Sequence, residues 1–169
     1  IARFAIMKCL ISYLACVALA ATPFSVLTAA TKGSKPTIWE ERAAERLKPV
    51  PAEMKAKIAE ALPGKLAAKV KKERRILVFW RCETFIHTSI PTANFAIQEL
   101  GRATGAFTAD LADDYSVFTE ANLKKYDAIL FNSTTSLRIP EGAQRKAVLD
   151  FIESGKGVIG IHAASDNFY

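Results

Sequence analysis

Residues 76–80 read Ile-Leu-Val-Phe-Trp, a continuous apolar run rich in β-branched and aromatic side chains. Such a run is typical of a strand that is buried on both faces. A similar run follows at residues 128–131, and two further strands are expected at residues 107–111 and 158–161. The centre of the fold is therefore predicted to be a set of buried strands.

Helical patterns separate these strands, at residues 91–105, 119–125 and 140–155. In the last of them, four apolar residues are expected to face inward: Ala143, Ala147, Phe151 and Ile152. Alternating strands and helices predict an α/β fold, with a parallel sheet covered by helices on both faces. Right-handed crossovers bring the carboxyl ends of the strands to one edge of the sheet, where such folds bind ligands.

The only two histidines of the chain both follow predicted strands. His87 lies in the loop after residues 76–80, and His162 directly follows residues 158–161 in the sequence Gly-Ile-His-Ala-Ala. Small residues around a reactive side chain at a strand-to-helix turn are typical of a nucleophile elbow, here with His where Ser or Cys would stand. The alternative for each histidine is a solvated or structural hydrogen-bonding residue.

A divalent metal is a further alternative for this edge, because Asp166 could join the two histidines as a third ligand. Protein metal sites normally use three or four ligands, and no other residue pattern indicates one. The sequence therefore leaves the cofactor open.

Other polar residues also follow the predicted strands. Glu83 is a candidate acid, base or substrate ligand, or else a surface carboxylate. Asn132, Ser133 and Thr134 carry groups that suit sugar hydroxyls, although such residues also commonly cap a helix. Cys82 is interpreted as a small, partly buried residue at a strand end, because no elbow sequence surrounds it.

The positive charge of the chain is concentrated at its N-terminal end. The chain carries 23 Lys and Arg against 17 Asp and Glu, a net charge of +6. Residues 1–75 hold 15 basic and 6 acidic side chains (net +9), whereas residues 76–169 hold 8 and 11 (net −3). The block with the candidate site is thus acidic, and the basic stretch 66–75 has no aromatic side chains for base stacking, so no nucleic-acid partner is expected.

Residues 1–31 have the pattern of a secretory signal peptide, with residues 1–6 interpreted as sequence upstream of a start at Met7. Lys8 precedes an uncharged, apolar stretch, and small residues follow at 28–30. A retained N-terminal membrane anchor is the alternative, but anchors need about 20 strongly apolar residues and Pro23 interrupts this stretch. The protein is therefore expected to be exported, either periplasmic or secreted.

Residues 32–75 are expected to form a helical, basic linker, with helices at 40–47 and 52–62. The α/β domain then occupies residues 76–169. Since Cys9 and Cys16 lie in the signal peptide, Cys82 is left alone in the mature chain and no internal disulfide is expected.

Four stretches resemble, in the right order, the ThuA-like (trehalose utilisation) family of the class I glutamine amidotransferase-like superfamily: residues 76–79, 85–91, 126–132 and 155–166. The resemblance implies a flavodoxin-like, three-layer fold and chemistry on carbohydrates of the trehalose or keto-sugar type. It also carries the functional residues of the family onto His87, His162 and Asp166. A true amidotransferase has Cys at this turn, so His162 makes glutamine hydrolysis unexpected.

Members of this family continue beyond the position of Tyr169 with further strands, so the chain is expected to be a C-terminally truncated fragment. Its sheet would then be incomplete at the C-terminus, with one face and one edge uncovered. The resemblance favours an exported sugar-modifying enzyme whose partner is a small-molecule carbohydrate. The alternative is a non-catalytic carbohydrate-binding or accessory module, and the oligomeric state stays open.

Overall fold

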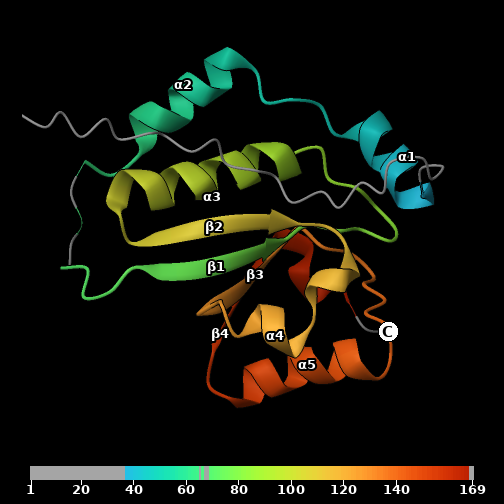
Figure 1. Ribbon diagram of the computed structural model, residues 1–169. Helices are drawn as coiled ribbons and strands as arrows, with labels where there is room; N and C mark the ends of the chain where they lie inside the picture. Colours follow the sequence, from blue (N-terminus) through green and yellow to red (C-terminus); the bar gives the residue numbers. More distant parts are fainter. Residues whose placement is uncertain (1–36, 65, 67–68, 168–169) are drawn as a thin grey trace, which may run out of the picture.

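The computed structural model describes residues 37–64, 66 and 69–167 (Figure 1). The signal peptide expected at residues 1–31 lies outside the described residues. Four parallel strands pair in the order β2-β1-β3-β4, and they are β1 (Arg74–Phe79), β2 (Phe107–Ala112), β3 (Ala128–Asn132) and β4 (Gly157–Ile161). This all-parallel sheet with its helices confirms the predicted α/β, flavodoxin-like fold class.

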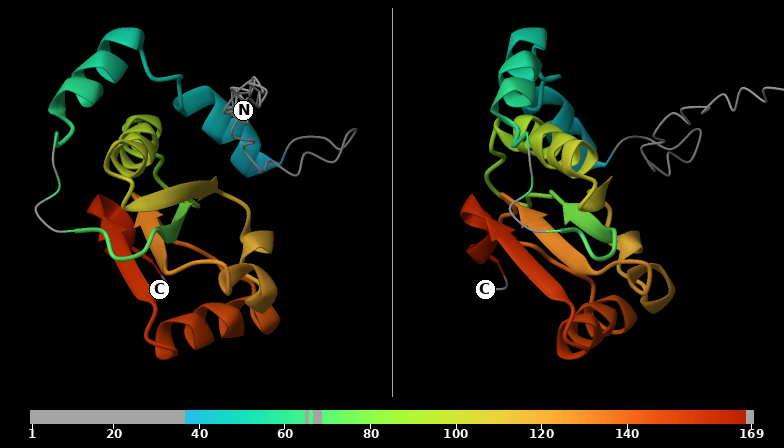
Figure 2. Two further views of the ribbon diagram at one scale, coloured as in Figure 1. Left: turned by 60° about the vertical axis from the view of Figure 1, so that its left-hand side comes forward. Right: turned by 90° about the vertical axis from the view of Figure 1, so that its left-hand side faces the viewer.

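The two central strands are buried on both faces, as their apolar runs predicted. Leu77 and Phe79 of β1 belong to a cluster that includes Phe151 of α5 (Ala143–Glu153). Ile76 and Val78 pack on the opposite face, in a cluster against Ile97 of α3 (Ile90–Thr104). Figure 2 shows the resulting three layers, with α3 on one side of the sheet and α5 with the short α4 (Glu120–Leu123) on the other.

The helix expected from residue 140 begins three residues later, at Ala143. Gly142 has φ +85°, a left-handed conformation that a helix cannot contain, and it therefore delays the start. The inward stripe also differs from the expected one: Ala147 and Phe151 are buried, but Ile152 is 43% exposed. Val148 is buried where Ile152 was expected to be.

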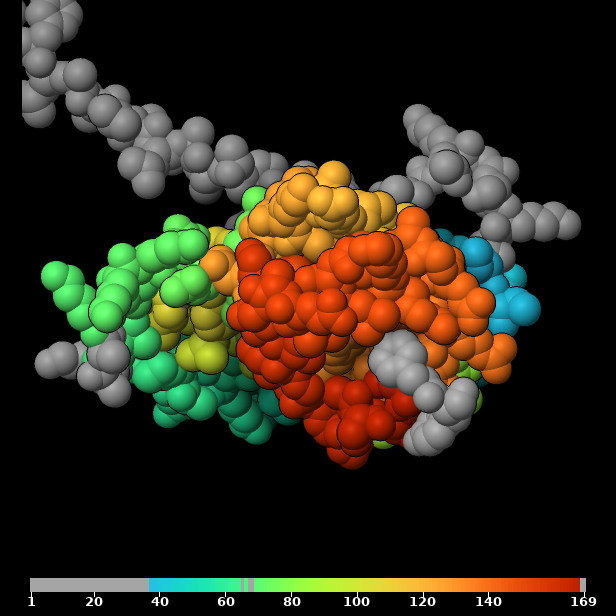
Figure 3. Space-filling view, turned by 90° about the horizontal axis from the view of Figure 1, so that it is seen from below, coloured from blue at the N-terminus to red at the C-terminus, as the bar shows by residue number. Residues whose placement is uncertain are grey.

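The face of the molecule that α5 covers is shown in Figure 3. There β4 forms one edge of the described sheet, and Val158 and Ile159 at this edge are 48% and 41% exposed. Leu149 of α5 is also exposed.

Within the described part of the chain, no helix combines the length and the apolar character that crossing a membrane requires.

The segment expected to be a linker contains a helix that is part of the folded unit. Helix α1 (Ile38–Arg46) starts with a capping box in which Thr37 and Glu40 bond each other's backbone N–H groups. Its Trp39 is 4% exposed and packs against Trp80, with ring centroids 5.7 Å apart. Helix α1 thus lies beside the carboxyl ends of β1 and β2 (Figure 1), and the linker interpretation is wrong for this part.

The second helix of this segment is α2 (Ala52–Ala61), close to the 52–62 expected from the sequence. It packs on the outer side of α3, where Lys55 lies over the ring of Phe95 at 5.4 Å. It has no buried residues, so its contribution to the core is small.

Replacing Gly101 by Ala is expected to destabilise the fold. A Cβ at this position of α3 would lie 2.3 Å from the backbone oxygen of Phe107, at the start of β2. Ala is a better helix former than Gly by about 1 kcal/mol, but such overpacking costs about 1–3 kcal/mol, so the net effect is a loss. Urea unfolding should show it, with Gly64→Ala as the control because no atom lies within 4 Å of a Cβ there. An unchanged midpoint for Gly101→Ala would contradict the close approach of α3 to β2.

Candidate functional site

The strand order places a topological switch point between β1 and β3. The chain leaves β1 toward α3 on one face of the sheet and leaves β3 toward α5 on the other. Ligands of open α/β sheets bind beyond the carboxyl ends of the strands at such a point. The residues that follow β1, β3 and β4 are therefore the ones to compare with the sequence predictions.

His162 occupies a sharp turn at the end of β4. It has φ +54°, a left-handed conformation that is uncommon for a residue other than glycine, and it opens the 3₁₀ helix η2 (His162–Ser165). A Cβ on Gly160 would lie 3.2 Å from the Cβ of Ala164, so the turn needs a small residue there. The strained turn and its small neighbours are the geometry that the elbow pattern predicted, and the imidazole of His162 is exposed.

Hydrogen bonds hold this turn to the loop that follows β3. The backbone N–H of Ser136 donates to the carbonyl oxygen of Asp166 at 2.6 Å. The side chain of Asn167 accepts from the N–H of Leu137 at 3.0 Å and donates to the Thr134 hydroxyl at 3.0 Å. Asn167 was not singled out in the sequence, since only its contacts with a loop 30 residues away reveal its role.

The two histidines lie against each other. The ring centroids of His87 and His162 are 4.4 Å apart, and the planes meet at 73°, an edge-to-face contact. They reach one another although β3 lies between β1 and β4 in the sheet. The predicted catalytic residues therefore come from two separate loops and meet at the strand-end edge.

The environment of His87 favours its neutral form. Partial burial lowers the pKa of His87 below its ordinary value of 6.5, and the charge of a protonated His162 lowers it further. The carboxylate of Asp166 opposes both effects and raises the pKa of His87. Asp166 is thus near enough to favour the imidazolium of His87, and all three predicted catalytic residues share one site.

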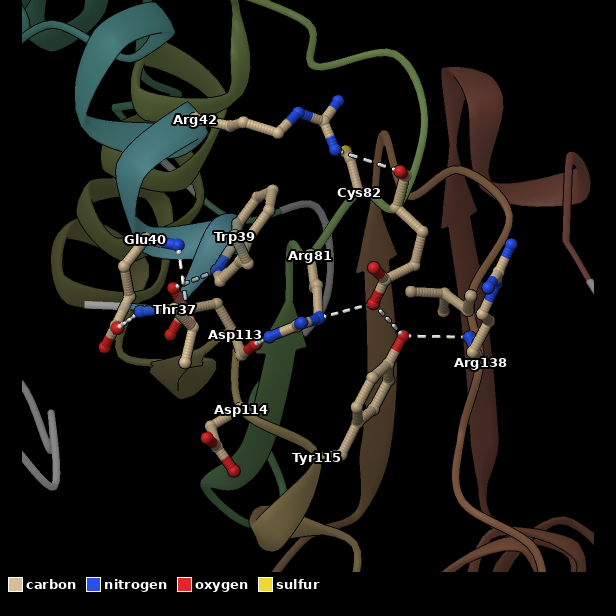
Figure 4. Close-up of polar contacts among 12 residues, drawn as sticks. Thr37, Trp39, Glu40, Arg42, Arg81, Cys82, Asp113, Asp114, Tyr115 and Arg138 are labelled. Atoms are coloured by element: carbon tan, nitrogen blue, oxygen red, sulfur yellow. Dashed lines mark hydrogen bonds and ion pairs between the residues drawn. The ribbon is translucent and has the colours of Figure 1, made fainter. Parts of the chain in front are cut away.

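Glu83 bonds two members of a polar network beside this edge, and Figure 4 shows Arg81, Tyr115 and Arg138 of this network. Its Oε1 accepts hydrogen bonds from Arg81 Nε at 2.6 Å and from the Tyr115 hydroxyl at 2.7 Å. Burial is the largest single effect and raises the pKa of Glu83, but the two hydrogen bonds together with the charges of Arg81 and Arg138 lower it overall. The Tyr115 oxygen also accepts from the backbone N–H of Arg138, so Glu83 ties the loop after β1 to the loop after β3.

Asn132, the last residue of β3, and the next two residues, Ser133 and Thr134, are buried, with exposed fractions of 2% or less. Asn132 Nδ2 donates to Asn94 Oδ1 at 2.9 Å, and Asn132 Oδ1 accepts from the Ser133 hydroxyl at 3.1 Å. The Thr134 hydroxyl accepts from Asn167. These side chains therefore bond protein groups inside the fold, rather than facing the surface as the prediction of sugar contacts requires.

Cys82 is fully buried, in keeping with its interpretation as a strand-end residue. Its thiol donates to the carbonyl oxygen of Ser133 at 3.2 Å, and burial raises its pKa. A buried thiol with a raised pKa is a poor nucleophile. Cys82 is thus a packing residue that joins the first two loops of the edge.

The described residues contain no cluster of three or more His, Cys, Asp and Glu side chains arranged to hold a metal ion. His87, His162 and Asp166 share one site, but they do not form such a set. Two imidazoles in contact beside a carboxylate can act in acid–base chemistry.

The chain is similar to known proteins. The family model described as ThuA, trehalose utilisation, matches residues 75–169. A solved structure of a ThuA-like protein from Bacteroides uniformis ATCC 8492 is similar at 23% sequence identity, with a TM-score of 0.42. The match covers 59% of this chain and 41% of that one, so the chain spans less than half of that protein's length. No curated protein matches the chain.

Proposed function

Since the chain belongs to the ThuA family, whose role is in trehalose utilisation, we propose that it is an exported enzyme that modifies a sugar of the trehalose or keto-sugar type. The observation that supports the proposal is the contact between His87 and His162, at 4.4 Å, on the ligand-binding edge of the sheet. Export rests on the sequence pattern of residues 1–31.

The chemistry that suits this pair is proton transfer on the sugar. His87, held largely neutral, accepts a proton from a hydroxyl group or from the carbon beside a keto group. His162, exposed on its strained turn, contacts the sugar and donates a proton to the oxygen on which negative charge develops. Asp166 stabilises the imidazolium that forms on His87.

The two imidazoles also divide these roles between them. A positive charge on His162 lowers the pKa of His87, so the pair holds one proton more readily than two. A neutral His87 can therefore accept a proton, while the neighbouring ring of His162 presents an N–H group to the sugar oxygen.

A non-catalytic carbohydrate-binding module is the second candidate. The exposure of His162 favours it, because enzymes usually exclude water from the groups that transfer protons. The two candidates differ in turnover, since a binding module would hold the sugar without changing it. The substitution of His162 in the Discussion separates them.

The pH profile of turnover tests the role of His87. Because the pKa of His87 lies below 6.5, kcat/KM is expected to be level near neutral pH and to fall by about tenfold per pH unit on the acidic side of that pKa. Rates on a keto derivative of trehalose, measured between about pH 5 and 8, would show this acidic limb. His87→Gln should lower the rate and abolish the limb, and a limb that survives this change would assign the proton acceptor to another group.

A further inference from the structure

A cavity of about 330 Å³ lies between α1 and the loop that follows β1, within the range of known ligand pockets. Its lining consists of six residues: Arg42, Glu45, Arg46, Thr84, Phe85 and Ile86. Helix α1 supplies half of them and lies outside the part of the chain that the family model matches. The cavity is therefore made jointly by this extra helix and by the strand-end edge that carries His87.

Phe85 is the feature of this cavity that packing does not explain. Its side chain is 58% exposed, whereas the next residue, Ile86, is 3% exposed and belongs to the core cluster around Trp39. An exposed aromatic ring offers a flat apolar face on which the ring of a ligand can stack. The ring of Phe85 also contacts that of His87, with centroids 4.8 Å apart, so it connects the cavity to the histidine pair.

The charged groups of the cavity offer a ligand both hydrogen-bond donors and hydrogen-bond acceptors. Arg42 donates to the backbone carbonyl oxygens of Glu83 and Thr84, so its guanidinium holds the wall of the cavity. Glu45 and Arg46 are exposed and of opposite charge, and the Arg46 guanidinium lies 5.7 Å from the centre of the Phe85 ring. Because Arg42 is committed to the wall, Glu45 and Arg46 are the charged groups left to bond a ligand beside the apolar ring. Together they supply acceptors and donors to hydroxyl groups.

We infer that this cavity is a subsite for one neutral sugar ring of a disaccharide, an inference that rests on the proposed function. The C–H face of the ring stacks on Phe85, and its hydroxyl groups bond Glu45 and Arg46. The adjoining sugar unit then lies over His87 and His162, where the proton transfer takes place. The inference places one ring of the substrate beside α1 and gives this helix a direct part in binding it.

Calorimetric titration of the full chain with trehalose and with glucose tests this subsite. Phe85→Ala is expected to weaken trehalose binding by roughly tenfold or more, whereas Phe85→Trp, which keeps an aromatic face, should bind within about threefold of the original. Phe95→Ala is the matched control. The ring of Phe95 also lies beneath a cation, that of Lys55, but Phe95 belongs to α3 and faces α2 rather than the cavity. Arg46→Ala and Glu45→Gln, both at exposed positions, should each weaken binding without unfolding the chain.

The outcomes separate this inference from the proposed function. If the original chain binds trehalose and Phe85→Ala binds it equally well, the subsite is elsewhere while the sugar function stands. If glucose 6-phosphate binds more tightly than glucose, the neutral character of the subsite is wrong. If the original chain binds no neutral sugar, both the subsite and the proposed function are overturned.

Discussion

Replacing His162 by Ala is expected to lower kcat on the sugar by about 10²–10⁴-fold, the usual contribution of a group that transfers a proton in the transition state. Binding of the sugar should change little, because the inferred subsite is centred on Phe85. The loss follows from the position of His162, whose exposed ring is presented by a strained turn and contacts His87 at 4.4 Å.

The turn itself calls for a second variant. Asn tolerates the left-handed conformation of this position better than Ala does, so His162→Asn removes the imidazole and leaves the turn unstrained. Ser165→Ala, in the same short helix, is the control for the backbone. Turnover, calorimetric binding and thermal unfolding should be measured on all three. Full turnover by His162→Asn would assign the proton donor to another group. Sugar binding without any turnover by the original chain would make the protein a binding module, and loss of sugar binding by His162→Asn would place the ligand on the histidines themselves.

Replacing Trp39 by Ala is expected to destabilise the fold by about 3–5 kcal/mol, the usual cost of deleting a large buried aromatic side chain. The ring is 4% exposed and packs against Trp80, and its N–H donates to Asp113 Oδ2 at 2.9 Å. Ile38→Ala is the control, because Ile38 belongs to the same helix but is 77% exposed, and it should change stability by less than about 0.5 kcal/mol. Equal stability of the two variants in urea would restore the linker interpretation of α1.

The milder variant Trp39→Phe separates packing from hydrogen bonding. Burial raises the pKa of Asp113, and the hydrogen bond from Trp39 and the charge of Arg81 partly oppose that rise, so losing the bond raises the pKa further. A carboxyl whose pKa is raised in the folded protein binds more protons in the folded state than in the unfolded state. The free energy of unfolding therefore falls as the pH rises from the pKa of this carboxyl in the unfolded chain to its pKa in the folded protein. The destabilisation by Trp39→Phe should therefore be smaller near pH 4 than near pH 7, and a loss independent of pH would contradict this account.

The sheet could be predicted from the sequence because its strands are continuous apolar runs between clear helix boundaries. The strand-end positions of His87 and His162 followed from the same pattern, since parallel connections bring those ends to one edge. The late start of α5 depends on the conformation of Gly142, which residue type alone does not determine. Ile152 was predicted to face the core because its side chain is apolar, but it is exposed. Val148, on the same helix, is buried instead.

The parts of the site that escaped prediction depend on contacts between distant segments. Asn132 and Thr134 have the polar groups of ligand-binding residues, and only their partners Asn94 and Asn167 reveal that they are buried. The role of α1 was missed for the same reason. Its apolar residues are few, and they are buried by residues that come much later in the chain.

The bond between Trp39 and Asp113 joins residues 74 positions apart. At about 5–20 residues per second, the ribosome needs roughly 4–15 seconds to make the intervening chain. During this interval the indole of Trp39 has neither its carboxylate partner nor a finished β2 beside it. Helix α1 is thus synthesised first among the described helices but docks late, and an exported chain that must stay unfolded until it has crossed a membrane would benefit from this delay.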